Sequence, residues 1–129
     1  MKLQESAENY LETIFALSMA GGSVRAVDVA AELEYSKPSV SVAMKNLREK
    51  GHISVNPDGS ITLTESVQKI AESIYERHML ISDWLIFLGV DKKTAVADAC
   101  KMEHSMSEQS FEAIKTHIES RRKEIRALE

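Results

Sequence analysis

Three residues of types that bind metal ions occur close together near position 100: Cys100, Glu103 and His104. Residues three and four positions apart lie on the same side of an α-helix, so these side chains would point the same way from adjacent turns. A thiol, a carboxylate and an imidazole suit a divalent transition ion better than magnesium or calcium. The alternative is a small core cysteine beside a solvated glutamate and histidine. The three residues alone slightly favour that alternative. Further polar residues, found elsewhere in the chain at positions where apolar residues are expected, favour the metal site instead.

The composition is that of a soluble globular protein, with 129 residues, 43% apolar and 28% charged. This length allows one domain or two small modules that share a core. A single cysteine cannot form an intrachain disulfide, and the N-terminal segment does not resemble a signal peptide. The longest apolar run, residues 84–88, is too short to span a bilayer. We therefore expect a cytoplasmic protein without a membrane partner.

The first half of the chain predicts a winged helix-turn-helix. A helix is expected over residues 5–20, ended by two glycines, followed by a short strand at 23–25 and a short helix at 27–33. Ser36 is a good N-cap and Pro38 suits a first turn, so a second, longer helix starts there and runs to about Lys50. Two alternating strands around the turn sequence at 56–59 then predict a hairpin. A hairpin directly after a helix-turn-helix is a wing.

The charge distribution favours DNA as the partner of this region. The net charge of the chain is −4, but residues 35–55 hold four basic residues against one acidic residue, a local charge of +3. Small hydroxyls and lysines suit phosphate contacts, and Val42 suits a thymine methyl group. A merely solvated helix face is the alternative. The predicted DNA-binding residues are Ser36, Lys37, Pro38, Ser39, Ser41, Val42 and Lys45.

A long helix is predicted from Thr64, as its cap, to about Leu88, and His78 interrupts its apolar stripe. An imidazole in an apolar row needs a partner, which is either a backbone carbonyl or a metal ion. Trp84 and Phe87 flank the stripe and add more apolar surface than one chain of this size needs. This surplus predicts a homodimer.

The helix that carries the three metal-binding residue types is expected over residues 92–106, with Asp91 as its cap. Its alanines and methionines form the packing stripe, so the three polar residues border the core. Ser105 and Glu108 match a capping box for the last helix, whose apolar stripe continues to Leu128.

With these elements in order, the chain resembles the diphtheria-toxin-repressor and manganese-transport-regulator family of metal-dependent transcription repressors. The resemblance covers nearly the whole chain. Its strongest matches are residues 8–14, Arg77-His78, Gly89-Val90-Asp91, Cys100-x-x-Glu103-His104 and Met106-Ser107. It implies a mainly α fold, with a winged helix-turn-helix DNA-binding domain at 1–64 and an α-helical metal-binding and dimerisation domain at 65–129. The chain is too short for the SH3-like domain of some members.

The resemblance also implies a metal site made of Glu12, His78, Cys100, Glu103 and His104, with Asn9 as a further candidate. Judged from local sequence alone, Asn9 and Glu12 are simply solvated. Asn9 departs from the family pattern, because an amide oxygen is a weaker and neutral ligand where relatives place methionine or aspartate. Cys100 resembles the iron-responsive branch, where manganese regulators have a carboxylate.

The expected function is therefore a repressor of metal-homeostasis genes, not an enzyme, that binds a palindromic DNA operator. Iron(II) is the favoured activator and manganese(II) the second candidate, while zinc(II) and cobalt(II) are expected to bind in vitro. Two other classes stay open from the residues alone. One is a metal-independent winged-helix regulator of a small organic ligand, and the other is a metal hydrolase with Glu103 as its base.

Overall fold

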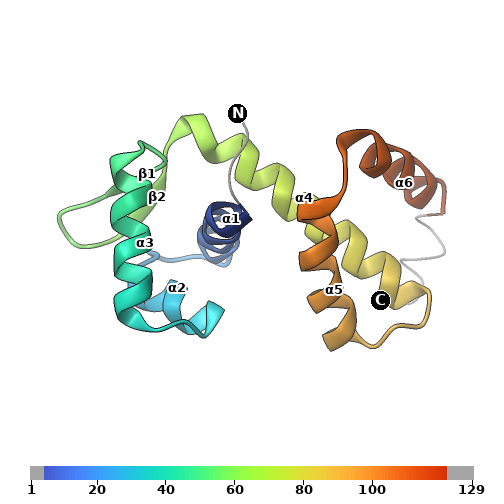
Figure 1. Cartoon of the computed structure of the whole chain (residues 1–129), viewed down its shortest axis with the longest axis horizontal. Helices are drawn as coiled ribbons and strands as arrows, with labels where there is room; N and C mark the ends of the chain where they lie inside the picture. The colour runs from blue at the N-terminus through green and yellow to red at the C-terminus, as the bar shows by residue number, and fades with distance from the viewer. Residues whose placement is uncertain (1–4, 122–129) are drawn as a thin grey trace. The chain divides into compact units, whose positions relative to one another are not determined.

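The computed structural model describes residues 5–121, and the chain forms two compact units, Met1–Tyr75 and Glu76–Glu129. Figure 1 traces six helices and two strands through this described part of the chain. The first unit contains α1 (Glu5–Met19), α2 (Ala26–Leu33), α3 (Lys37–Glu49), β1 (Ile53–Val55) and β2 (Ile61–Leu63). Helix α4 (Glu65–Phe87) begins in the first unit and ends in the second, which also contains α5 (Lys92–Ser105) and α6 (Glu108–Ser120). None of the described helices is long and apolar enough to cross a membrane.

Helices α1, α2 and α3 and the first part of α4 share one hydrophobic core in the first unit. Helix α1 contributes Leu11, Ile14 and Phe15, which are spaced so that they fall on one helical face. Val40 of α3 is fully buried against this core, and burying a side chain of this kind contributes about 1.5–3 kcal/mol. The core therefore fixes which face of α3 points inward and leaves the opposite face exposed.

Helix α3 begins and ends as its sequence predicts. The Ser36 side chain accepts a hydrogen bond from the Ser39 backbone N–H at 3.3 Å, and Pro38 stands in the first turn. Gly51 follows the helix with φ 77°, a left-handed conformation that favours glycine. Together with the short α2 before it, this helix completes the predicted helix-turn-helix.

The wing is a two-stranded antiparallel hairpin in which Val55 pairs with Ile61 and Ile53 with Leu63. The predicted strand at 23–25 is wrong, because this segment has no strand conformation. A single backbone hydrogen bond of 2.7 Å, from the Ile61 N–H to the Val24 carbonyl, joins it to β2. The segment therefore packs against the hairpin without extending its ladder.

Thr64 stands at the N-cap position of α4, as predicted, because its carbonyl accepts from the Val67 and Gln68 N–H groups at 3.1 Å, while its hydroxyl binds elsewhere. Its hydroxyl donates to the Gly51 carbonyl at 2.8 Å and also lies 3.1 Å from the His52 carbonyl. The Thr64 N–H donates to the same His52 carbonyl at 3.0 Å. Thr64 thus joins the start of α4 to the loop between α3 and the wing.

In the second unit, Gly89 separates α4 from α5 with φ 107°. Asp91 caps α5 as predicted, because its carboxylate accepts from the Thr94 N–H at 3.1 Å and from the Thr94 hydroxyl at 2.8 Å. These hydrogen bonds stabilise the charged carboxylate and lower the pKa of Asp91 below its usual value.

The capping box predicted from Ser105 and Glu108 is wrong. Ser105 is the last residue of α5, and its hydroxyl donates to the Lys101 carbonyl. Ser107 is the N-cap of α6 and accepts from the Ser110 N–H at 3.1 Å. The far end of the apolar stripe predicted for this last helix, to Leu128, lies outside the described residues.

Candidate metal centre and nucleic-acid interface

Small residues of α5 pack into the hydrophobic core of the second unit. Ala99 is fully buried in one cluster with Ile81 of α4 and Phe111 of α6, and Ala95 is fully buried one turn before it. Met102 packs against the same cluster, as the predicted stripe requires. This packing determines the rotation of α5 and therefore the direction of the side chains beside the stripe.

Cys100, Glu103 and His104 come together as their spacing predicts. Each offers one ligand atom, and these three atoms all lie within 4.8 Å of one another. The Glu103 side chain is 0% exposed and that of His104 is 2% exposed. The Nε2 atom of His104 lies 3.4 Å from Oε1 of Glu103. The alternative in which Glu103 and His104 are solvated is therefore wrong.

His78 reaches the same carboxylate from α4. Its Nδ1 atom lies 3.1 Å from Oε2 of Glu103, and its side chain is 17% exposed. The histidine that interrupts the apolar stripe of α4 is thus directed at the candidate metal ligands of α5. Sequence reasoning left open whether its partner was a carbonyl or a metal site, and the structure places it beside the site.

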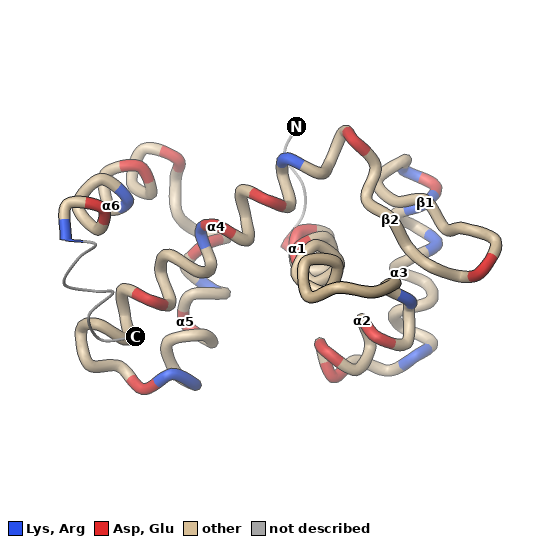
Figure 2. The backbone as a smooth tube through the Cα atoms, turned by 180° about the vertical axis from the view of Figure 1, so that it is seen from behind, with Lys and Arg blue, Asp and Glu red and all other residues tan. Residues whose placement is uncertain are grey.

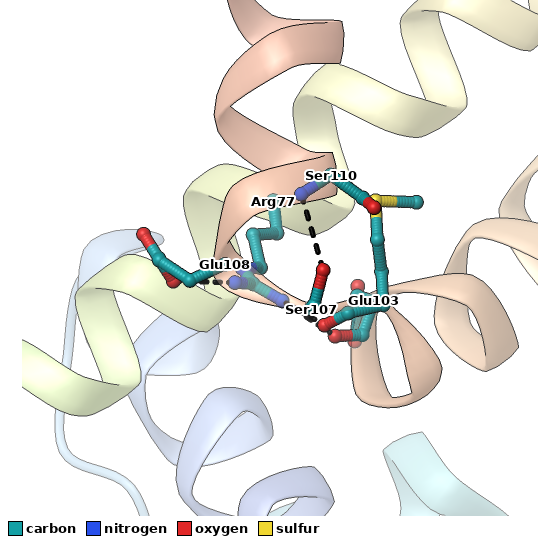
Figure 3. A network of polar contacts seen from close by, with 6 residues as sticks. Arg77, Glu103, Ser107, Glu108 and Ser110 are labelled. Atoms are coloured by element: carbon teal, nitrogen blue, oxygen red, sulfur yellow. Dashed lines mark hydrogen bonds and ion pairs between the residues drawn. The ribbon is translucent and has the colours of Figure 1, made fainter.

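The neighbouring residue, Arg77, is a contact that sequence reasoning missed. Its Nη1 atom donates to the backbone carbonyls of Glu103 at 3.0 Å and Met106 at 3.2 Å. Its Nη2 atom donates to Glu108 at 2.6 Å, and the guanidinium lies 4.6 Å from the centroid of the Phe111 ring. Figure 3 shows Arg77 reaching from α4 toward Glu103 and Glu108. The sequence signals at this position were the Arg77-His78 match and a long cationic residue beside the stripe histidine, and neither named its contacts.

The two remaining candidate ligands lie in the first unit. Asn9 and Glu12 are partly buried on α1, three residues apart on one edge of that helix. Both take part in interactions, so neither is simply solvated as their local sequence suggests. Their assignment as metal ligands stays a prediction.

The residues of the second unit fit a divalent transition ion. A carboxylate without exposure to water is costly to bury as an anion unless charge or hydrogen bonds compensate it. Here it is surrounded by a thiol and two imidazoles, and sulfur and nitrogen donors are those that iron, zinc and cobalt accept readily. A bound ion would neutralise the anionic donors and hold α4 and α5 together.

The predicted DNA-binding residues all lie on the first unit and all are exposed. They are Ser36, Lys37, Pro38, Ser39, Ser41, Val42 and Lys45. Val42 is 61% exposed, so its side chain is free to make the predicted contact. Basic residues occur along α3 in Figure 2, and no acidic residue lies in the first turn of that helix.

Comparison with known proteins decides between the classes that the residues left open. Residues 2–61 match the family described as the iron dependent repressor, N-terminal DNA binding domain. Residues 64–125 match the iron dependent repressor, metal binding and dimerisation domain. The chain belongs to the iron-dependent repressor family.

Relatives in this family include both manganese and toxin regulators. The transcriptional regulator MntR of Escherichia coli O6:H1 is 36% identical over 112 residues, which cover 87% of this chain and 72% of the relative. The diphtheria toxin repressor of Corynebacterium glutamicum is 31% identical over 108 residues, covering 83% and 47%. The solved structure of the manganese regulator SloR is 25% identical with a TM-score of 0.77, covering 92% of this chain and 55% of that one.

Membership of the iron-dependent repressor family confirms the main sequence predictions. The chain is a metal-dependent transcriptional repressor with a mainly α fold, an N-terminal DNA-binding domain and a following metal-binding and dimerisation domain. Proteins of this family are DNA-binding regulators rather than enzymes, so the prediction of no enzymatic activity is confirmed and the hydrolase is wrong. The metal-independent regulator is set aside for the same reason.

Proposed function

We propose that this repressor is activated by iron(II) and then binds a palindromic operator as a homodimer, to control genes of metal-ion homeostasis. The observation that carries the proposal is the convergence of the ligand atoms of Cys100, Glu103 and His104 within 4.8 Å. His78 is the fourth ligand that we propose from the second unit, supported by its 3.1 Å distance to Glu103. Because its target is DNA, we propose that the protein acts in the cytoplasm.

The response to metal is proposed to depend on ligands from both units. Glu12, and Asn9 more weakly, would add donors from α1 in the DNA-binding unit to those on α4 and α5. Without metal, the anionic donors repel one another and leave the DNA-binding unit loosely placed. With metal, the units are joined, and two copies of α3 in a dimer reach successive major grooves about 34 Å apart. The ion shifts the population because it binds the DNA-competent arrangement better.

The preference for iron rests on the donor chemistry. Cys100 supplies a soft sulfur ligand, which favours iron(II), zinc(II) or cobalt(II) over manganese(II) relative to a carboxylate. Asn9 contributes no charge, and hard manganese(II) gains less from a neutral amide oxygen than from a carboxylate at that position. Manganese is the second candidate, and the regulators MntR and SloR among the relatives favour it.

The test is an anaerobic titration of DNA binding against a genomic operator library, with iron(II), manganese(II), zinc(II) and a chelator in parallel. We expect iron(II) to give half-maximal DNA binding at a lower free concentration than manganese(II). The double variant Asn9→Asp with Cys100→Glu should shift the preference toward manganese(II). If the parent protein reaches half-maximal DNA binding at a lower free concentration of manganese(II) than of iron(II), Cys100 does not set the selectivity.

A further inference from the structure

Two consecutive residues of α4 bind opposite ends of the same metal-site residue. His78 faces the side-chain carboxylate of Glu103 at 3.1 Å, while Arg77 donates to its backbone carbonyl at 3.0 Å. The carboxylate is a ligand that a metal ion would also hold, but the carbonyl is on the opposite, main-chain side. Arg77 therefore holds Glu103 through a group that a metal ion would not use as a ligand.

The carbonyls that Arg77 binds belong to the C-terminal end of α5. Carbonyls in the last turn of a helix lack intrahelical partners and carry the negative end of the helix dipole, so a cation stabilises them. The Arg77 side chain is 13% exposed, which strengthens these hydrogen bonds relative to bonds made in water. Glu103 and His104 lie in this same last turn, so its geometry decides where two of the proposed ligands point.

Arg77 also joins this turn to α6. Its second nitrogen, Nη2, donates to Glu108 in the first turn of α6, and its guanidinium lies over the Phe111 ring one turn later. The planar fork of an arginine serves these several acceptors at once, which a lysine ammonium cannot do with the same geometry. One side chain of α4 thus fixes the junction between α5 and α6.

We propose that Arg77 is a positioning residue of the metal centre, which holds the last turn of α5 in the ligand-competent conformation before metal binds. This inference rests on the proposed metal site and adds a residue that touches no metal. Groups that orient metal ligands typically change metal affinity about 10–100-fold when they are removed. Arg77 does so through the main chain of Glu103.

Cobalt(II) alone serves as the probe, added anaerobically to the full-length chain, because its absorption spectrum reports ligand geometry. We expect Arg77→Met to weaken cobalt affinity about 10–100-fold and to alter the spectrum of the bound ion. Arg77→Lys keeps the charge without the fork, so it should restore part of the affinity. Lys115→Met is the matched control, because it removes another contact between α6 and α4, the 2.7 Å ion pair with Glu76, without touching α5.

The control separates positioning from general stability. We expect cobalt affinity and spectrum in Lys115→Met to stay those of the parent, with at most a small fall in the melting temperature of the metal-free protein, because a partly exposed ion pair contributes about 0–1 kcal/mol. Equal losses of affinity in Lys115→Met and Arg77→Met would overturn the inference, since looser packing would then explain both. A parental affinity and spectrum in Arg77→Met would overturn it too. If Arg77→Met does not fold, Arg77→Lys decides, and unchanged cobalt binding in that variant refutes the positioning role.

The same titration distinguishes this inference from the proposed function. A parent protein that does not bind cobalt(II) overturns both the metal site and the role of Arg77. A parent that binds cobalt(II) through sulfur, with the thiolate absorption lost in Cys100→Ser, supports the metal site. If Arg77→Met then matches the parent, the positioning role alone is refuted.

Discussion

Replacing Glu103 by glutamine should nearly abolish metal stabilisation while changing the metal-free protein little. The Glu103 side chain is 0% exposed, and glutamine has the same shape, so no cavity forms. In the parent protein, Nδ1 of His78 lies 3.1 Å from Oε2 of Glu103, and the glutamine amide can form a hydrogen bond with His78 at the same place. The change in the free energy of unfolding without metal should therefore stay within about 1 kcal/mol.

The metal-dependent part of the stability follows from mass action. An ion present at 100 times its dissociation constant adds about 2.7 kcal/mol to the free energy of unfolding. If the variant binds about 100-fold more weakly, the same concentration adds only about 0.4 kcal/mol. At about 2.1 cal/mol/K per residue, the 129 residues of this chain turn these values into melting shifts of about 10 °C and about 1.5 °C.

Calorimetry with and without cobalt(II) measures both shifts under anaerobic conditions. Asp98→Asn is the matched control, because Asp98 is an exposed carboxylate on the same helix, and its variant should keep the full parental shift. A metal-induced shift of about 10 °C in Glu103→Gln would refute the reasoning, since the buried carboxylate would then contribute little to metal binding.

Three further outcomes are expected. Lys37→Glu or Lys45→Glu should weaken operator binding and flatten its dependence on salt in a fluorescence titration without lowering the melting temperature; unchanged binding in both would place the recognition surface elsewhere. Asp91→Ala should destabilise the protein most near neutral pH. Because folding lowers the pKa of Asp91, its carboxylate contributes to the free energy of unfolding above the ordinary pKa of 3.8, and this contribution is lost as the pH falls through the folded pKa. Thermal unfolding followed from pH 7 to pH 2 checks this, and a difference that grows in acid would contradict it. Sedimentation at micromolar concentration should show a dimer without metal, and a monomeric parent would contradict this. Leu88→Asp, at a position 59% exposed, should shift the equilibrium from dimer toward monomer.

The elements that depend on local signals are predictable from the sequence. Ser36, Pro38 and Gly51 define the ends of α3, because each acts on backbone groups within its own turn. The spacing of Cys100, Glu103 and His104 likewise predicts their convergence, since one helix carries all three. These features need no knowledge of the rest of the fold.

The features that failed depend on contacts between distant segments. Glu108 matches a capping box in sequence, but Arg77, 31 residues earlier, binds its carboxylate, and Ser107 caps the helix instead. Thr64 stands at the predicted N-cap position of α4, yet its hydroxyl binds carbonyls 12 and 13 residues away. In both cases a tertiary hydrogen bond replaces the local one that the pattern predicts.

The site shows the same division. That His78 has a polar partner follows from its place in an apolar stripe, but the identity of the partner required the packing of α4 on α5. The contacts of Arg77 with the main chain of Glu103 and Met106 leave no pattern in the sequence, since any residue supplies a carbonyl. Contacts with the main chain are predictable within one turn, as for Ser36, but not when the carbonyl belongs to a distant segment.

The most direct test of the account is the affinity for one operator with and without metal. Fluorescence anisotropy of labelled operator DNA, measured anaerobically at fixed salt, gives the dissociation constant in excess iron(II), in excess manganese(II) and in chelator. Coupling between two sites of one protein is typically 5–150-fold, and we expect at least about fivefold tighter binding with metal, reversed by chelator. Equal dissociation constants in metal and chelator would contradict metal-dependent repression by this chain.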